Sequence, residues 1–242
     1  MTDRPERTLR ILGELDDLIV TWFRYEPGEK GPDPHVHHHH TDAFYVLEGG
    51  IEVSLGPELS TFEARPGTLA AAPPDVVHTF RNASDETAIF LNMHVPSMGF
   101  GDHMRGRTKA FDQHDPPADG GRPLPEAVVC MASEAELVEH DTSSLRILCD
   151  LPQLSALDLT FSPEFEGVDP HVHPDHADSF YVLEGEVEFH TTGGPRRGGP
   201  GTFFSAPRNV EHGFHNPGPG PLCVFNLHTP AGGFVDRVRR RA

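Results

Sequence analysis

One pattern of histidines and an aspartate occurs twice in this chain, and it constrains the fold more than any other feature. The first copy, Pro34 to Gly49, has the sequence PHVHHHHTDAFYVLEG, and the second, Pro170 to Gly185, has the sequence PHVHPDHADSFYVLEG. The two copies align without a gap from their first position to their last. Because alternate side chains of a strand point to one face, the two histidines of each His-x-His pair can aim at a single point, as a metal site requires.

The duplication extends over most of the chain. The loop after the motif is slightly shorter in the second copy, and beyond it the match resumes, with Pro66 aligned to Pro200 and His94 to His228. Each half is long enough to bury its own core. The stretch 112–124 is rich in Pro, Gly and Asp, which is typical of a linker. We therefore predict an N-terminal domain over residues 1–111, a linker over 112–124 and a C-terminal domain over 125–242.

Short apolar stretches separated by turn residues predict an all-β fold. Gly and Pro occur 24 times each. The segments 51–55 and 186–189 alternate polar and apolar residues with a period of two, which is typical of strands with one face in water. No long amphipathic helix is evident. Two closed or sandwiched β units are the natural arrangement for so many short strands.

Composition narrows the possible partners and location. The 19 Lys and Arg residues are outnumbered by 37 Asp and Glu, and the net charge of −18 argues against binding to nucleic acid. No apolar stretch is long enough to cross a membrane, and no signal peptide is evident. The three cysteines, Cys130, Cys149 and Cys223, lack a C-x-x-C spacing, so we expect reduced thiols and a cytoplasmic protein. Open β edges favour a homodimer.

Both halves resemble the cupin superfamily in the spacing of two motifs. The matching residues are His35, His37, Asp42, Gly49, Pro66, Gly67, Pro73, His78 and Asn82 in the first half, and His171, His173, Asp178, Gly185, Pro200, Gly201, Pro207, His212 and Asn216 in the second. The resemblance covers nearly the whole chain outside the linker and the termini. It implies two tandem cupin barrels (double-stranded β-helix, or jelly-roll, units), that is, a bicupin. Both copies have Asp where the family usually has Glu, which is one methylene longer.

The resemblance also implies one divalent metal ion in each half, and so two in each chain. The implied ligands are His35, His37, Asp42 and His78 in the first half, and His171, His173, Asp178 and His212 in the second. Three imidazoles and a carboxylate suit Fe, Mn, Ni, Co, Cu or Zn and leave coordination positions open. Sequence does not choose among these metals.

Two further pairs of histidines repeat, and each has two interpretations. His40 and His176 either replace the short Asp as fourth ligand or are exposed loop residues. His94 and His228 either act near the metal as hydrogen-bond donors or proton relays, or are ordinary strand histidines.

Three functions follow from the resemblance. The chain is similar to quercetinase-like dioxygenases, oxidoreductases in which a metal binds an enediol-like small molecule and the carboxylate acts as base. In that case the catalytic residues are Asp42, Asp178, His94 and His228. A redox-neutral isomerase or cyclase would use the same metal as a Lewis acid. A non-catalytic cupin would hold metal and ligand without turnover. The complete ligand sets favour an enzyme, since both halves retain them.

Overall fold

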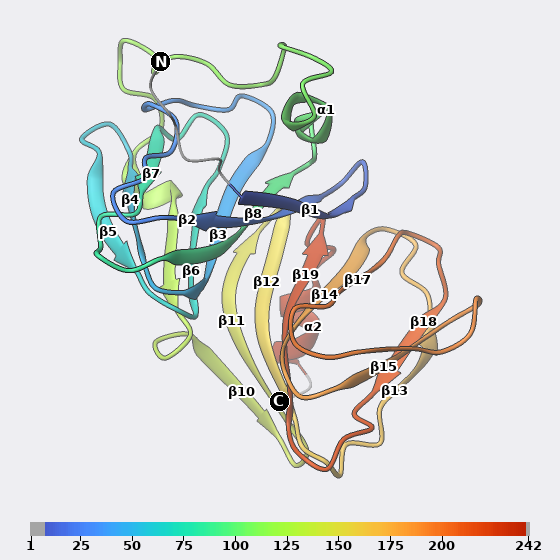
Figure 1. Cartoon of the computed structure of the whole chain (residues 1–242). Helices are drawn as coiled ribbons and strands as arrows, with labels where there is room; N and C mark the ends of the chain where they lie inside the picture. Colours follow the sequence, from blue (N-terminus) through green and yellow to red (C-terminus); the bar gives the residue numbers. More distant parts are fainter. Residues whose placement is uncertain (1–7, 241–242) are drawn as a thin grey trace. The chain divides into compact units, whose positions relative to one another are not determined.

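The computed structural model describes residues 8–240, and its contacts separate two compact units, residues 1–133 and 134–242. The regular structure of both units is mainly antiparallel strand, and the described residues also form two short α-helices, α1 (Phe100–Met104) and α2 (Phe234–Arg239) (Figure 1). Within residues 8–240 no helix has the length and apolar character needed to cross a membrane. The all-β prediction is confirmed, and so is the prediction of two cupin-like units.

The first unit has a larger and a smaller sheet. The larger has the strand order β1-β2-β8-β3-β6-β9, and the smaller has the order β5-β4-β7. The strands are β1 (Thr8–Glu14), β2 (Ile19–Tyr25), β3 (Thr41–Glu48), β4 (Ile51–Leu55), β5 (Ser60–Ala64), β6 (Thr68–Ala72), β7 (His78–Arg81), β8 (Ala88–Val95) and β9 (Val128–Met131). A short 3-10 helix, η1 (Leu124–Glu126), precedes β9.

The second unit repeats this arrangement with a different outer strand. Its larger sheet has the order β10-β11-β12-β19-β14-β17, and its smaller sheet has the order β13-β18-β15-β16. The strands are β10 (Glu136–His140), β11 (Ser143–Leu151), β12 (Leu154–Phe161), β13 (Val168–His171), β14 (Ala177–Glu184), β15 (Val187–Thr191), β16 (Arg196–Gly198), β17 (Phe203–Ala206), β18 (His212–His215) and β19 (Leu222–Thr229).

The period-two pattern places apolar side chains in a core within each unit. Along β4, Ile51, Val53 and Leu55 are buried, while the residues between them are only half-buried. Along β15, Val187 and Phe189 are buried in the same way. Each set belongs to an apolar cluster of its own unit. The hydrophobic effect therefore favours the same strand faces in both halves.

A glycine ends the apolar run of the motif in both units because the backbone requires one. Gly49 and Gly185 have φ of +65° and +81°. A Cβ atom would lie 2.3 Å from the carbonyl oxygen of Thr87 or of Pro221, respectively. The spacing that the two copies share thus includes a turn that only glycine can make without strain.

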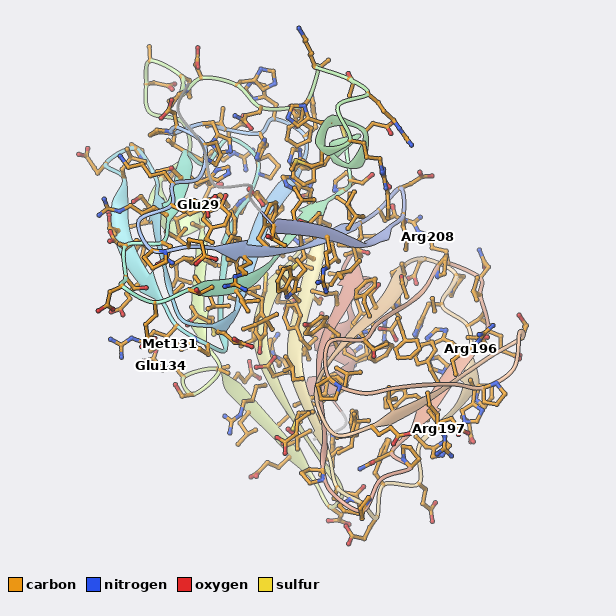
Figure 2. All side chains as sticks on the ribbon, in the orientation of Figure 1. Glu29, Met131, Glu134, Arg196, Arg197 and Arg208 are labelled. Atoms are coloured by element: carbon orange, nitrogen blue, oxygen red, sulfur yellow. The ribbon has the colours of Figure 1, made fainter. Side chains whose placement is uncertain are left out.

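The boundary between the units differs from the one expected from sequence. Strand β9 pairs with β6 of the first unit, from Thr68 opposite Met131 to Ala71 opposite Val128. Met131 and Glu134, labelled in Figure 2, lie on either side of the division. The apolar run 127–131 indicates a strand, but its sequence alone does not show which sheet edge it joins. The contacts place residues 112–133 with the first unit, and the pairing joins Val128–Met131 to its larger sheet.

Candidate metal centres

The first centre consists of His35, His37, Asp42 and His78. Each residue offers a ligand atom, and the four atoms all lie within 4.8 Å of one another. The Oδ2 atom of Asp42 is 3.2 Å from Nε2 of His78 and 3.7 Å from Nε2 of His37. Asp42 lies near the start of β3 and His78 at the start of β7, so the two sheets contribute ligand atoms to one point.

The imidazoles of the first centre are oriented for a metal by their other ring nitrogens. His35 Nδ1 donates to the carbonyl of Asp33 (2.8 Å), and His78 Nδ1 donates to that of Val76 (3.0 Å). These bonds leave the Nε2 lone pairs free. The Nε2 atom of His37 is buried and has no hydrogen-bond partner in the protein. A buried nitrogen without a partner is costly unless a ligand occupies it, so this donor set fits a divalent ion.

The second centre, His171, His173, Asp178 and His212, has the same geometry. His171 Nδ1 donates to the carbonyl of Asp169 (2.9 Å), and Oδ2 of Asp178 is 3.3 Å from Nε2 of His212 and 3.7 Å from Nε2 of His173. The Nε2 atoms of His171 and His173 are 3.0 Å apart. The structure therefore brings together all eight residues that sequence identified as candidate ligands, four in each unit.

An asparagine that sequence analysis did not single out orients the carboxylate in each centre. The side-chain amide of Asn226 donates to Oδ1 of Asp178 (2.7 Å) and to the carbonyl of Ser179 (3.1 Å). Asn92 makes the corresponding bond to Oδ1 of Asp42. Each amide engages one carboxylate oxygen, so the other is available to a metal. The signal was present in the sequence, because the two asparagines align in the duplication and share the strand parity of His94 and His228.

The surrounding imidazoles keep both carboxylates ionised. Burial alone would raise the pKa of Asp42, but His94, His37 and His78 outweigh it and hold that pKa well below its usual value. The pKa of Asp178 is lowered in the same way, against burial, by the imidazoles that surround it. Both carboxylates are therefore anionic over the physiological range, as metal ligands must be.

His40 lies beside the first carboxylate rather than in its place. Its Nδ1 atom donates to Oδ2 of Asp112 (2.9 Å), so its Nε2 atom carries the lone pair, and that atom lies 2.9 Å from Nδ1 of His94. Its ring stacks on that of His37 with centroids 4.0 Å apart. His37, His40 and His94 also have ring nitrogens within 4.8 Å of one another, but Nδ1 of His40 is already bonded to Asp112. This geometry favours Asp42 as the fourth ligand.

The corresponding histidine of the second unit has a different partner. His176 Nδ1 donates to Oδ1 of Asp175 (2.7 Å), an aspartate whose side chain is 61% exposed, and its Nε2 atom has no partner in the protein. His94 and His228, the candidate relay residues, occupy equivalent places in the two units. Their Nε2 atoms donate to the Oδ1 atoms of Asn92 (3.1 Å) and Asn226 (2.9 Å), respectively.

A segment after the last strand of the first repeat closes the first centre. We call residues 111–114 the cover segment. The carbonyl of Asp112 accepts from Nδ1 of His37, and its carboxylate accepts from the backbone amides of His38 (3.2 Å) and His39 (2.8 Å). The ring of Phe111 lies against His37, with centroids 5.5 Å apart. All four residues of the first centre are buried, and the cavity that reaches Asp42 is only about 240 Å³.

The second centre is open by comparison. A cavity of about 540 Å³ reaches His171, His173 and Asp178. The side chain of His173 is 17% exposed, whereas that of its counterpart His37 is 1% exposed. Apolar side chains form most of the wall: Leu145, Leu159, Phe161, Phe165, Val168, Phe180, Phe214, Phe234 and Val238. The second centre can therefore admit a molecule that the first cannot.

Comparisons with known proteins agree with this architecture. A family model described as "Cupin domain" matches residues 21–94 and 158–228. Among solved structures, a variant oxalate decarboxylase of Bacillus subtilis is 17% identical, covering 89% of this chain and 70% of that chain, with a TM-score of 0.64. A structure of the same enzyme at pH 4.6 gives 17% identity, coverage of 89% and 69%, and a TM-score of 0.63.

A third structure was reported for work on the Mn(II) centres of the Bacillus subtilis enzyme. It is 16% identical, covers 89% of this chain and 70% of that chain, and has a TM-score of 0.64. At these identities the likeness is one of fold. The search of curated proteins found no match.

Proposed function

This chain belongs to the cupin family, and on that premise we propose that it is a metal-dependent, dioxygenase-type oxidoreductase whose reaction takes place in its second unit. The observation that carries the proposal is the apolar cavity of about 540 Å³ that opens onto the second centre. Sites of this kind, with a few converging polar groups in an apolar wall, are typical of small-molecule binding. The first centre, closed by the cover segment, is then a structural metal centre.

The cavity favours a substrate with an apolar, ring-sized body. Most of the area of its wall is apolar, and among the described residues that line it Arg237 is the only arginine or lysine. The guanidinium of Arg237 donates to the carbonyl of Gly232 (2.6 Å) and lies over the ring of Phe234. Oxalate, the molecule named for the structural neighbours, is a small dianion and would leave most of this wall in contact with water. An enediol or a flavonol-like molecule fills it better and can present two oxygens to the second centre.

The carboxylate ligand favours oxygen chemistry over Lewis-acid chemistry. The Oδ2 atom of Asp178 faces the ligand imidazoles, while His176 is directed to Asp175. A carboxylate lowers the net charge of the site, whereas a fourth imidazole would leave a divalent ion more positive and better suited to forming hydroxide. When bound, the metal would acidify a coordinated enediol or hydroxyl group and provide open positions for substrate and O2.

His228 is the candidate relay for the proton that such a substrate loses. Its ring lines the cavity, and because its Nε2 atom donates to Asn226, the lone pair is on Nδ1, which is buried and has no partner in the protein. Burial, together with the neighbouring imidazoles, lowers the pKa of His228 to about 3, even though Asp178 acts in the opposite direction. The ring is therefore neutral at physiological pH and accepts a proton only from a group that is already acidified. Asp178, an anionic carboxylate at the same centre, is the other candidate base.

The test is O2 uptake by metal-loaded protein with flavonol-like and enediol compounds. We expect O2 uptake with at least one compound class. In Asp178→Asn the rate of uptake should fall about 100-fold or more, because this change removes the carboxylate from the centre that the cavity reaches. The matched control is Asp42→Asn, the same change in the closed centre, where we expect less than a tenfold loss.

Other outcomes distinguish the alternatives. Conversion of substrate without O2 uptake would replace the proposal with a redox-neutral isomerase or cyclase. Saturable binding without conversion would indicate a ligand-binding cupin. A larger loss in Asp42→Asn than in Asp178→Asn would move the reaction to the first unit and overturn the assignment of the cavity.

A further inference from the structure

The small sheet of the second unit carries a group of metal-binding side chains on the face turned away from its core. Glu188 and His190 are alternate residues of β15, and His215 is the last residue of β18, directly opposite Glu188 in the pairing. Their neighbours Phe189 and Phe214 point the other way and belong to the apolar core. We call Glu188, His190 and His215 the outer cluster. It lies on the opposite side of the sheet from the second centre, because His212 of β18 shares the inward parity of Phe214.

The spacing of the outer cluster is that of a coordination site. Its three ligand atoms lie within 4.8 Å of one another. The Nε2 atom of His190 is 3.0 Å from Nδ1 of His215 and 3.5 Å from Oε1 of Glu188. Ligand atoms about 2.1 Å from a tetrahedral zinc ion are separated by roughly 3.4 Å from each other. The cluster therefore needs little rearrangement to surround one ion.

We propose that the outer cluster is a third divalent-metal site, distinct from the two cupin centres and suited to Zn²⁺. Two imidazoles and one carboxylate form the ligand set, and a water molecule takes the remaining position. The side chains of His190 and His215 are 39% and 33% exposed, so the site is open to an ion in solution. The ion would join β15 to β18, the strand that carries His212 on its other face.

The equivalent face of the first unit lacks this site, which makes it a built-in control. At the positions that align with Glu188, His190 and His215 in the duplication, it has Glu52, Ser54 and Arg81. There Arg81 donates to both carboxylate oxygens of Glu52, at 2.9 and 3.0 Å. A guanidinium occupies the position of the second imidazole, and it cannot bind a cation. Of these two aligned sets, only that of the second unit combines the carboxylate with two imidazoles.

A neighbouring arginine moderates the site without blocking it. Arg197, labelled in Figure 2, donates from Nε to Oε2 of Glu188 (2.6 Å). That bond engages one carboxylate oxygen, while Oε1 faces the two histidines. The positive charge beside Glu188 opposes binding of a cation, since like charges repel. Removing Arg197 should therefore strengthen binding, whereas removing either histidine should abolish it.

The experiment is equilibrium dialysis of the full-length protein against Zn²⁺, with bound zinc counted per chain. The variants His190→Ser and His215→Arg introduce the residues that the first unit carries at the same sheet positions, so the strands should accept them. Each is expected to bind one equivalent less than the wild type. Ser54→Ala in the first unit is the control and should not change the count. Circular dichroism establishes that each variant is folded.

A change that should strengthen binding tests the role of the Glu188 carboxylate. Arg197→Gln removes the positive charge beside Glu188, so this variant is expected to bind zinc at the outer cluster about tenfold more tightly. Unchanged affinity would show that Glu188 is not a ligand. Equal zinc counts in the wild type, His190→Ser and His215→Arg would overturn the proposal. Each variant is compared with the wild type, and the two cupin centres are the same in both. The result therefore does not depend on whether the protein has dioxygenase activity.

Discussion

The first and second centres have the same four ligand types at the same spacing, yet they differ in what surrounds them. In the first, the cover segment places Asp112 and Phe111 over His37, and the adjoining cavity is about 240 Å³. In the second, an apolar cavity of about 540 Å³ reaches His173. Ligand geometry is therefore preserved between the halves by the strands, while access is set by segments outside the repeat. The comparison teaches that equal metal centres need not be equal active sites.

The largest expected effect comes from removing a metal ligand in each half separately. His78→Ala and His212→Ala, each loaded with Mn²⁺, should each lose about one of the two cupin-bound equivalents, because a site of four ligands loses much of its affinity with one of them. Metal analysis of the purified variants measures this. Loss of both equivalents in a single variant would show that the centres are coupled. Unchanged content in both variants would show that these histidines are not ligands.

The next effect concerns the closure of the first centre. Asp112→Ala removes a carboxylate that accepts from two backbone amides and from the rings of His40 and His114. Hydrogen bonds to a charged group contribute about 1.5–3 kcal/mol each, so the cover segment should detach more readily. We expect a chelator to remove metal from the first centre at least tenfold faster than in the wild type.

The second unit supplies the control for that experiment. Asp175 also accepts from a histidine, His176, but its side chain is 61% exposed. Asp175→Ala should therefore change the rate of metal removal from the second centre only slightly. Equal acceleration in the two variants would mean that the cover segment does not limit access to the first centre.

The smallest expected effect is a difference in acid sensitivity between the metal-free units. Burial is the main cause that lowers the pKa of His35 to about 3 and that of His40 to about 4. In the unfolded chain these groups would take up protons near pH 6.5, so the unfolded state binds more protons as the pH falls and stability is lost. Between pH 6.5 and pH 5 each such histidine should cost roughly 1.5 kcal/mol.

The second unit combines opposing contributions over the same pH range. Burial lowers the pKa of His228 to about 3, which acts as in the first unit, but the hydrogen bond of His212 to Asp178 raises the pKa of His212 in spite of its burial. The contribution of His212 is fully present below pH 6.5 and is lost as the pH rises through its folded pKa. Hydrogen exchange of the two units from pH 7 to pH 5 should show greater opening in the first. Equal opening would contradict this prediction.

The sequence was sufficient to predict the features that occur in both copies of the duplication. The His-x-His spacing, the third histidine and the glycine after the motif are local patterns, and each was visible because a second copy aligns with the first. The eight candidate ligands, which the structure brings together in two groups, were identified from this repeat together with the resemblance to the cupin superfamily. Asn92 and Asn226 were equally visible in the sequence, but their role depends on a hydrogen bond to another strand.

The features that occur only once could not be predicted in the same way. Asp112 lies in a stretch whose composition is that of a linker, and its contacts are with His38, His39 and His40, which lie far earlier in the chain. Strand β9 is short and apolar, and either sheet could have accepted it by composition. The cavity depends on the packing of side chains from many strands. All three features depend on contacts between residues that are far apart in the chain, and local periodicity does not encode such contacts.

The pairing of β9 with β6 has a consequence for how the first half is made. A ribosome releases the chain from its N-terminus, and the outer strand β9 emerges only after β8, α1, the cover segment and η1. Until Met131 has emerged, β6 is a sheet edge with unpaired backbone groups, open to pairing with another chain. The contacts of the first half extend to residue 133, so a fragment cut at residue 111 would lack both its edge strand and Asp112.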